Sequence, residues 1–546
     1  MRGLVAILAA CAAACAPAKA LRDYVAAFNA GDEELYTNAV PNAAAADFLE
    51  RNVPTFECPD ADVERAYAFR WWTYRKHLRK TPDGWVVTEF LPDVGWAGRN
   101  NTISCPLGHH LREGRWLRNP AFLDDFIRFM VTKGAVSGPR AYVCWPAWAA
   151  VERAKVTGDL RPATALLAAF KKNYAAWEKG WAVRSLSLAD PRVSCVQPIR
   201  GAPFRAGFRA DRGLFDGCGD REGSEFALSK DGARPLVNAA LWAEARAIAA
   251  LARAAGDAAG AAAFEARAAV LERNVRAKLW NGRRRFYTAL GADGAQDDVC
   301  ELSGYAPFYF RMPQPPERLA AWDGLMDERG FFAPAGLAFP RRDTPGFDVS
   351  IDVSKHECLW NGPSWPYATS LALTALYETL QSGARPARAT AADFAALVGQ
   401  YARQHVRVRA DGTRVAWIDE NLHPFTGAWI ARDVLIEQAR RRGTPVTYRE
   451  RGKDYNHSTF CDLVIAGLCG VVPQRGGALA VRPLAPASWD WFRLARVRYH
   501  GRDLEVVWDR TGLKFGKGRG LSAWMDGVEV GRAAGLCPLE GLSAKK

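Results

Sequence analysis

Residues 237–280 read VNAALWAEARAIAALARAAGDAAGAAAFEARAAVLERNVRAKLW, and this stretch predicts a hairpin of two α-helices. Apolar side chains recur every three or four residues on both sides of the AAGDAAG turn, a spacing that places them on one face of a helix. The second half, 261–278, also keeps a charged face, so we expect it to lie at the surface. Repeated along a chain, hairpins of this kind build an all-helical domain.

The same periodicity recurs through most of the chain between residues 120 and 470. Two segments, 364–380 and 457–469, are apolar nearly all round, whereas 261–278 and 390–404 carry a charged face. That contrast indicates an inner ring of buried helices covered by an outer ring, with a funnel mouth formed by loops. A stacked solenoid is the alternative, but the sequence has no fixed repeat period. Further helices are expected at 122–134, 147–158, 163–181, 315–327 and 430–441.

The two ends of the chain differ from this helical region. RAYAFRWWTYRKH (65–77) predicts a helix, while WVVTEFL (85–91) and NNTISC (100–105) predict short strands. Near the C-terminus, segments alternate apolar and polar residues and end at Gly or Asp turns, which predicts a small antiparallel β-sandwich. We therefore expect a mainly α fold with a mixed segment at 21–120, a helical toroid at 121–475 and a β domain at 476–546.

The first twenty residues, MRGLVAILAACAAACAPAKA, resemble a secretory signal peptide that ends at Ala20. LAAC, ending at Cys11, also fits a bacterial lipoprotein box, and an ordinary buried helix is the remaining interpretation. No other stretch is long and apolar enough to span a bilayer. We therefore expect a protein that is secreted, periplasmic or in the secretory pathway.

Composition narrows the class of function. The net charge is +14, but the arginines are scattered and form no dense basic run, so nucleic acid is not expected as a partner. Twenty tryptophans suit a cleft that stacks sugar rings on flat apolar faces, beside a core that uses many of them. The cysteines are widely spaced and form no CxxC pair, so neither a disulfide pairing nor a structural zinc site is predicted.

Three polar and aromatic segments adjoin helices: FDGCGDREGSEF (215–226), WNGPSWPYATS (360–370) and IDENLHPFTGAW (418–429). Hydrolysis of a glycosidic bond needs one carboxylic acid to protonate the leaving oxygen. It also needs a second carboxylate on the other face of the sugar, roughly 6.5–9.5 Å away when it activates water. Only residues from distant hairpins can lie on both sides of a sugar in this way. Glu222 and Glu420 fit that description; a helix cap and a solvated loop charge are the competing interpretations.

These segments resemble motifs of the (α/α)6-barrel glycoside hydrolases, the group of processing α-glucosidase, trehalase and mannosylglycerate hydrolase. GDREGS resembles their GMDNS, GWDFSS and GMEGS turns, ENLHPFTG resembles their ENYxPxTG segment, and WNGPSWPYATS is similar to their WxGPxWP segment. YNHSTFCDLVIAGL (455–468) resembles their last inner helix. The motifs occur in the same order over about 60–475, which implies an (α/α)6 toroid of six hairpins followed by a β domain.

The resemblance implies roles for the acidic residues. Glu420 matches the base motif and would deprotonate the attacking water in an inverting reaction. Glu222 falls where the relatives place the general acid, usually an Asp. The substitution and the neighbouring Asp220 leave the acid open between these two residues, with Glu225 as a third candidate. The acid must stay protonated near neutral pH, which requires burial or a like-charged neighbour.

Other residues are expected to bind the sugar rather than to react with it. Trp360 and Trp365 would stack on its flat faces and Asn361 would bond its hydroxyls, although a buried helix start explains the same residues. The expected binding set is Asp220, Trp71, Trp72, Trp96, Arg115, Trp116, Trp360, Asn361, Trp365 and His457.

The sequence therefore predicts a secreted glycosidase that cleaves an α-linked sugar. One alternative is a polysaccharide lyase in which Tyr455, with His457 or His110, abstracts a proton. Another is an inactive sugar-binding protein, which the Glu at position 222 favours. HHLRE (109–113) is not an HExxH motif, so no metal is expected. Some relatives hold calcium, but no DxDxDG loop requires it, and no cofactor is expected. The sugar, its linkage and the oligomeric state are not specified.

Overall fold

The computed structural model describes residues 16–134, 136, 142–183, 204–351, 356–409, 411–445 and 450–543. The expected signal peptide lies mostly outside these ranges, as does Cys11, and the first described helix is α1 (Ala16–Ala30). Among the helices described, none is both long enough and apolar enough to cross a membrane.

Six helices of the described chain contact one another in turn and close a ring. They are α4 (Leu107–Gly114), α6 (Pro146–Thr157), α9 (Pro235–Ala254), α11 (Ala306–Tyr309), α12 (Pro366–Gln381) and α15 (Phe460–Asp462), which continues as a π-helix over Leu463–Leu468. Every residue of α12 except Glu378 is buried. The nearly unbroken apolar pattern of this segment therefore reflects a helix that is covered on all sides.

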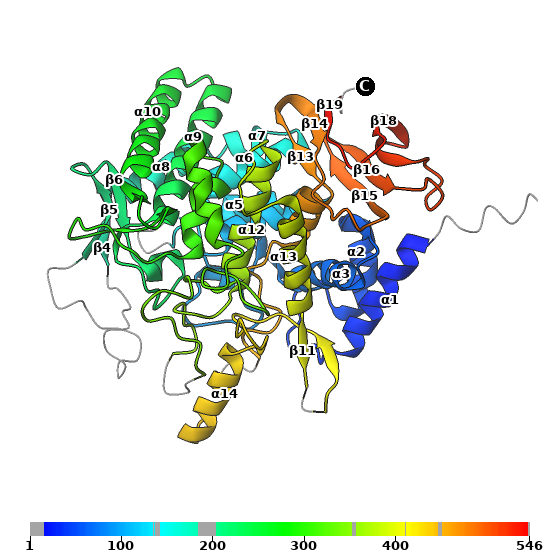
Figure 1. Ribbon diagram of the computed structural model, residues 1–546, viewed down its shortest axis with the longest axis horizontal. Coiled ribbons are helices and arrows are strands. Elements are labelled where there is room, and N and C mark those ends of the chain that lie inside the picture. Colours follow the sequence, from blue (N-terminus) through cyan, green and yellow to red (C-terminus); the bar gives the residue numbers. More distant parts are fainter. Residues whose placement is uncertain are drawn as a thin grey trace, which may run out of the picture.

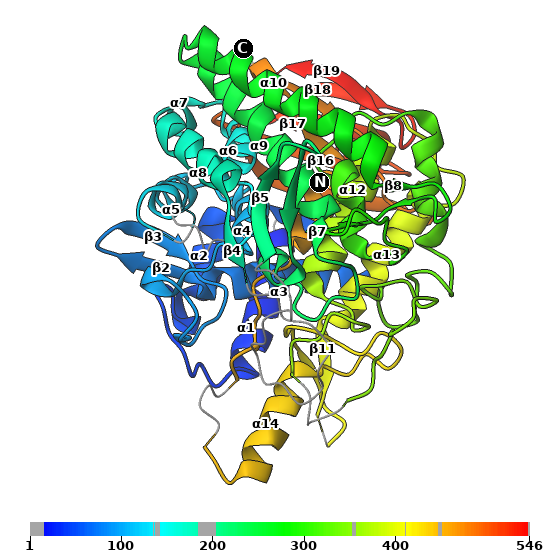
Figure 2. The same cartoon turned by 90° about the vertical axis from the view of Figure 1, so that its left-hand side faces the viewer.

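A second layer of helices covers the ring. Helix α10 (Ala258–Asn274) packs on α9, α13 (Ala391–Gln404) packs on α12, and α3 (Ala61–Lys76) contacts α13 and α15. The hairpin predicted over residues 237–280 is thus one inner and one outer helix, with α10 at the edge of the molecule beside α9 (Figure 1). The expected (α/α)6 toroid is confirmed. Helix α14 (Ala431–Arg442) projects from the rest of the molecule in both views (Figures 1 and 2). The remaining described α-helices are α2 (Ala45–Asn52), α5 (Ala121–Thr132), α7 (Arg161–Thr164) and α8 (Leu167–Lys179).

The expected C-terminal β domain consists of two antiparallel sheets, ordered β1-β15-β16-β17-β18 and β13-β14-β19. Strand β1 comes from the N-terminal segment and pairs Phe56 with Leu494 of β15, so the two ends of the chain share a sheet. The bounds are β1 Thr55–Glu57, β13 Val471–Pro473, β14 Ala478–Val481, β15 Trp491–Tyr499, β16 Arg502–Asp509, β17 Gly520–Met525, β18 Val528–Ala533 and β19 Leu539–Ser543.

Further sheets lie outside the β domain. The largest has the order β10-β7-β6-β5-β4, and its strand β6 leads directly into the acidic segment at 215–226. Three two-stranded pairs, β2–β3, β8–β9 and β11–β12, complete the described sheets. The bounds are β2 Leu78–Thr81, β3 Gly84–Val87, β4 Trp181–Val183, β5 Phe204–Arg209, β6 Leu214–Gly217, β7 Gly232–Ala233, β8 Trp280–Asn281, β9 Phe286–Tyr287, β10 Leu290–Gly291, β11 Val406–Val408 and β12 Arg414–Ala416.

Two local predictions were wrong. NNTISC (100–105) forms no strand, because Asn100 and Asn101 take positive φ values of 61° and 58°, which interrupt extended backbone. The segment 315–327 forms a 3-10 helix over Pro316–Gly324 rather than an α-helix. The cysteines among the described residues are free thiols.

Candidate active site

Main-chain hydrogen bonds join the polar segments that lie far apart in the sequence. The Trp360 N–H donates to the Glu225 carbonyl at 3.2 Å. Ser364 and Leu422 each donate a 2.9 Å hydrogen bond to the other's carbonyl. The acidic turn, the tryptophan turn and the segment after Glu420 therefore meet where helix α12 begins.

Glu222 lies in this region, but its side chain is held within the core. One carboxylate oxygen accepts a 2.8 Å hydrogen bond from Arg234 Nε, and the other accepts a 3.0 Å bond from the Val237 N–H in the first turn of α9. The Glu222 and Arg234 side chains are each 1% exposed. Burial raises the pKa of Glu222, whereas Arg234 lowers it. The geometry is that of an anchor between the acidic turn and α9.

Glu225 follows three residues later and is half-buried. Burial and, next, the charge of Asp220 raise its pKa to about 8, and Glu89 and Glu420 contribute in the same direction. The Glu225 carboxyl is therefore largely protonated at neutral pH. Asp220 is itself half-buried, and burial raises its pKa while Arg221, 3.4 Å away, lowers it.

Glu420 is 2% exposed, and both of its carboxylate oxygens are bonded. Oε1 accepts hydrogen bonds from Arg451 Nε at 3.0 Å and Nη2 at 2.8 Å, while Oε2 accepts one from the Cys358 thiol at 3.0 Å. The preceding Asp419 accepts the Glu420 N–H at 2.9 Å. Burial and the charge of Glu420 raise the pKa of Asp419 to about 7. Fixed donors of this kind hold a carboxylate in one orientation.

His457 lies beside the same carboxyl groups. Its Nε2 lies 2.6 Å from Glu89 Oε1, and its Nδ1 bonds the Tyr455 hydroxyl. Burial, followed by the charges of Glu89 and Glu420, raises the pKa of Tyr455 well above its usual value. Glu89, His457 and Tyr455 thus form a buried chain of polar side chains. It runs from the loop after β3 to the segment before α15.

The two tryptophans of the WNGPSWP turn stack on each other. The ring centroids of Trp360 and Trp365 are 4.0 Å apart with an interplanar angle of 8°, and the residues are 1% and 2% exposed. Buried polar atoms nearby have no hydrogen-bond partner among the described residues: Trp360 Nε1, Asn361 Oδ1 and the Tyr367 hydroxyl. Water or a ligand normally satisfies such groups.

Four other expected binding residues are buried among core partners. Trp71 and Trp72 are buried in α3, and Trp72 Nε1 donates to Asn29 at 2.8 Å. Arg115 and Trp116 both bind the buried Asp462. All four expected binding residues therefore lie in the core. The inner faces of the toroid also need large side chains for close packing.

Trp96 differs from the buried Trp71, Trp72 and Trp116. It is 50% exposed, packs edge-on against Phe90 at 5.8 Å, and has the Arg451 guanidinium 5.2 Å from its ring. Arg451 also binds Glu420, so Trp96 lies at the solvent side of the Glu420 pair.

One group of side chains has the composition of a metal site. Single ligand atoms of His356, Glu357 and Cys358 lie within 4.8 Å of one another. However, the Cys358 N–H donates to His356 Nδ1 at 3.0 Å, and Arg451 lies 3.2 Å from Glu357. These atoms are therefore already used in hydrogen bonds beside a cation, an arrangement that does not favour a metal ion.

Several members of this site carry no distinguishing signal in the sequence. Glu89 lies in WVVTEFL, which was predicted as a strand, and nothing distinguishes it from other acidic residues. Cys358 and Arg451 carry no motif, and their role depends on contacts made only in the folded chain. Glu225 was the third candidate for the acid, because it lies outside the aligned part of the motif.

The described toroid thus has several carboxyl groups and buried unpartnered polar atoms at one end of its inner helices, which suits the binding of a sugar. Comparison with known proteins finds glycoside hydrolases. Residues 207–458 match the mannosylglycerate hydrolase MGH1-like glycoside hydrolase domain, and residues 473–531 match the C-terminal domain of glycosyl hydrolase family 65. Residues 207–458 are thus similar to an MGH1-like glycoside hydrolase domain, and the resemblance inferred from the motifs is confirmed.

Two solved structures are similar over most of the chain. One, named "Sialidase", is 31% identical and has a TM-score of 0.83; the alignment covers 97% of this chain and 45% of that one. This chain therefore spans less than half the length of that relative. The second is a GH78 family rhamnosidase of Bacillus sp. GL1, with 16% identity, a TM-score of 0.51 and coverage of 84% and 40%, which shows a shared fold.

Proposed function

We propose that this chain is a glycosidase that hydrolyses an α-linked sugar with inversion, using Glu225 as the general acid and Glu420 as the general base. The observation that carries the proposal is the contrast between these two carboxyl groups. The pKa of Glu225 is raised to about 8, whereas Glu420 is bonded to Arg451. Neighbouring carboxyl groups with opposed environments are the arrangement that acid and base catalysis requires.

Glu225 suits the acid role better than the two candidates that the motif favoured. Its carboxyl is half-buried and protonated at neutral pH, so it has a proton to give to the leaving oxygen. Glu222 is occupied by Arg234 and by the α9 amide. Asp220 raises the pKa of Glu225, which is a supporting electrostatic role.

Glu420 would accept the proton of the attacking water. Arg451 holds one of its oxygens in place, and the Cys358 thiol holds the other. The nearby Asp419 has a pKa of about 7, so it is partly protonated at neutral pH and adds only part of a negative charge. We infer that the sugar lies between the two loops that carry Glu225 and Glu420.

The unpartnered polar atoms of Trp360, Asn361 and Tyr367 are suited to bind sugar hydroxyls, since they supply both donors and an acceptor. We propose that Trp360 contributes its indole N–H rather than a ring face, because Trp365 covers one of its faces. His457, held by Glu89 and Tyr455, would present its ring to the same sugar.

The relatives narrow the choice of substrates to test. The matched domain takes its name from mannosylglycerate hydrolase, and the relative at 31% identity is named "Sialidase". A panel should therefore contain α-mannosides, α-glucosides, mannosylglycerate, α-rhamnosides and sialosides. The anomer released first, followed by proton NMR, reports inversion or retention.

Glu420→Gln is the variant to run beside the wild type on this panel. Loss of a general base lowers kcat by about 10²–10⁴-fold, with KM little changed. Equal rates for the two proteins would exclude Glu420 as the base. A retained anomer would exclude the inverting mechanism.

A lyase is less well supported. Its base would be Tyr455 assisted by His457, but burial and two nearby carboxylates hold the pKa of Tyr455 well above its usual value. A phenolate is therefore disfavoured at this position. An unsaturated product that absorbs in the ultraviolet would nevertheless identify the lyase reaction in the same panel.

We also propose that the protein is exported, on the basis of the leader that ends at Ala20. Mass spectrometry of the mature N-terminus tests this. A chain beginning at Leu21 supports a signal peptide, a lipid-modified Cys11 supports an anchor, and an intact Met1 in the cytoplasm contradicts export.

A further inference from the structure

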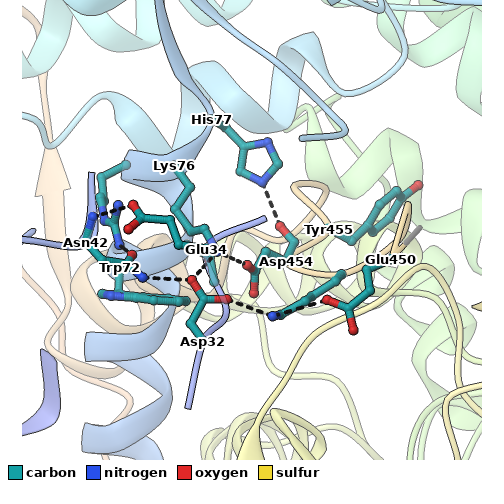
Figure 3. Close-up of polar contacts among 12 residues, drawn as sticks. Asp32, Glu34, Asn42, Trp72, Lys76, His77, Glu450, Asp454 and Tyr455 are labelled. Atoms are coloured by element: carbon teal, nitrogen blue, oxygen red, sulfur yellow. Dashed lines mark hydrogen bonds and ion pairs between the residues drawn. The ribbon is translucent and has the colours of Figure 1, made fainter. Parts of the chain in front are cut away.

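We infer that a buried ion network joining the N-terminal segment to the matched glycoside hydrolase domain positions Glu420 and His457. Its members are Asp32, Lys76 and Asp454 (Figure 3), with Lys453 as a second cation. Asp32 and Lys76 belong to the N-terminal segment, whereas the domain match begins at residue 207. The expected effect on catalysis rests on the proposed function, whereas the expected effect on the conformation of segment 450–457 does not.

The network is a chain of alternating charges with almost no access to solvent. Lys76 Nζ lies 3.0 Å from Asp32 and 2.5 Å from Asp454, and the three side chains are 4%, 3% and 2% exposed. Lys453 Nζ binds the other oxygen of Asp32 at 2.7 Å. Burial alone would raise the pKa of Asp32, but Lys76 and Lys453 hold it well below its usual range. Breaking such a buried set leaves an uncompensated charge.

Asp454 connects this network to the proposed base. Its φ is 61°, a left-handed conformation that is uncommon for residues other than glycine, so its surroundings must hold it in place. Its N–H donates to the Ile418 carbonyl at 2.9 Å, two residues before Glu420. Arg451, three residues before Asp454, binds Glu420 directly.

The same residue also sets the path of the chain toward His457. The neutral ring of His77, whose pKa burial lowers to about 3, donates from Nε2 to the Asp454 carbonyl at 2.7 Å. On its other side, His77 Nδ1 lies 3.2 Å from the Thr88 hydroxyl, and Thr88 precedes Glu89. His77 therefore fixes the start of the segment that carries His457 relative to the segment that carries its partner Glu89.

These contacts explain why buried ion pairs, and not apolar packing alone, occur beside segment 450–457. The segment 450–457 has no helix or strand, so turn hydrogen bonds and side-chain contacts fix its backbone. Arg451 reaches Glu420, while Lys453 and Asp454 reach Asp32 and Lys76. We therefore assign Lys76 as a positioning residue, although its ion-pair partners are Asp32 and Asp454 rather than Glu225 or Glu420.

The test compares Lys76→Met with Arg153→Met. Both remove one buried cation, but Arg153 pairs with Asp124 between α6 and α5, away from segment 450–457. Hydrogen–deuterium exchange is measured on peptides covering 450–458. We expect faster exchange there in Lys76→Met and no change in Arg153→Met, with Lys76→Arg restoring slow exchange. Unchanged exchange in Lys76→Met overturns the inference.

Kinetics on the glycoside that the wild type cleaves supply the second readout. We expect kcat to fall about 100-fold in Lys76→Met with KM changed less than about threefold, because a small displacement of a catalytic group costs rate. Faster exchange without a loss of kcat contradicts the positioning role. If the wild type cleaves no glycoside, the proposed function fails, while the exchange experiment still decides whether Lys76 fixes the segment.

Discussion

Arg451 donates two hydrogen bonds to a single oxygen of Glu420, from Nε at 3.0 Å and from Nη2 at 2.8 Å. This leaves Oε2 of Glu420 to the weak thiol donor of Cys358 at 3.0 Å. The two oxygens of the proposed base are thus held by donors of very different strength. Oε2 is the oxygen that can exchange its partner for a water molecule at the lower cost.

Replacing Arg451 with Met should lower kcat, because the proposed base loses both donors that fix its Oε1. We expect kcat to fall about 100-fold with KM little changed, since a small displacement of a catalytic group costs rate. Arg451→Lys should restore part of kcat. An unchanged kcat in Arg451→Met would show that Arg451 does not position Glu420.

The basic limb of the pH profile of kcat should be governed by Glu225. Because the acid works only when protonated, activity is expected below pH 8 and should decline as the pH rises through its pKa of about 8. Asp220→Asn removes one neighbouring charge that raises this pKa, so the basic limb should move to lower pH. Rate measurements between pH 5 and about 10 test both statements; a basic limb that moves upward in Asp220→Asn would contradict them.

Glu222→Gln should affect folding more than catalysis. The variant leaves Arg234 with one carboxylate partner fewer in a site with almost no solvent access, and breaking such a pair costs about 3–5 kcal/mol. Urea denaturation measures this loss. The folded variant should keep kcat within about threefold of wild type, the range expected when no catalytic group is removed.

Trp96→Ala should raise KM and leave kcat unchanged, because the ring is half-exposed beside Arg451 and suited to stack on a sugar. A loss of one aromatic contact corresponds to an increase of about two- to tenfold. Trp116→Phe is the control. Its indole N–H donates to Asp462 within the core, so it should lower the free energy of unfolding without altering KM. Equal KM values for Trp96→Ala and wild type would remove Trp96 from the substrate site.

The sequence was most informative where a pattern of residues has a single physical cause. Apolar periodicity predicted the inner and outer helices, and alternation predicted the C-terminal strands, because burial of a face dictates both patterns. Tryptophans were less informative, since Trp71, Trp116 and Trp96 look alike in sequence. A large ring fills a core or lines a surface according to neighbours that only the fold brings together.

The site was harder to predict for the same reason. Three acidic residues lie between 220 and 225, and their spacing does not reveal which of them meets Arg234. That contact depends on the Gly223 turn, with φ 71°, which separates Glu222 from Glu225. Arg451 and Lys76 belong to a set of 73 Lys and Arg residues without a distinguishing motif, so their partners could be identified only in three dimensions.

The most direct test of the central claim is the dependence of Glu225→Gln on the leaving group. On the sugar that the wild type cleaves, kcat/KM is compared for an alkyl glycoside and a dinitrophenyl glycoside. A missing general acid should cost about 10²–10⁴-fold on the alkyl glycoside and little on the activated one, which departs without a proton. Glu222→Gln should show no such dependence. Full activity of Glu225→Gln on the alkyl glycoside, with the loss appearing in Glu222→Gln instead, would contradict the account.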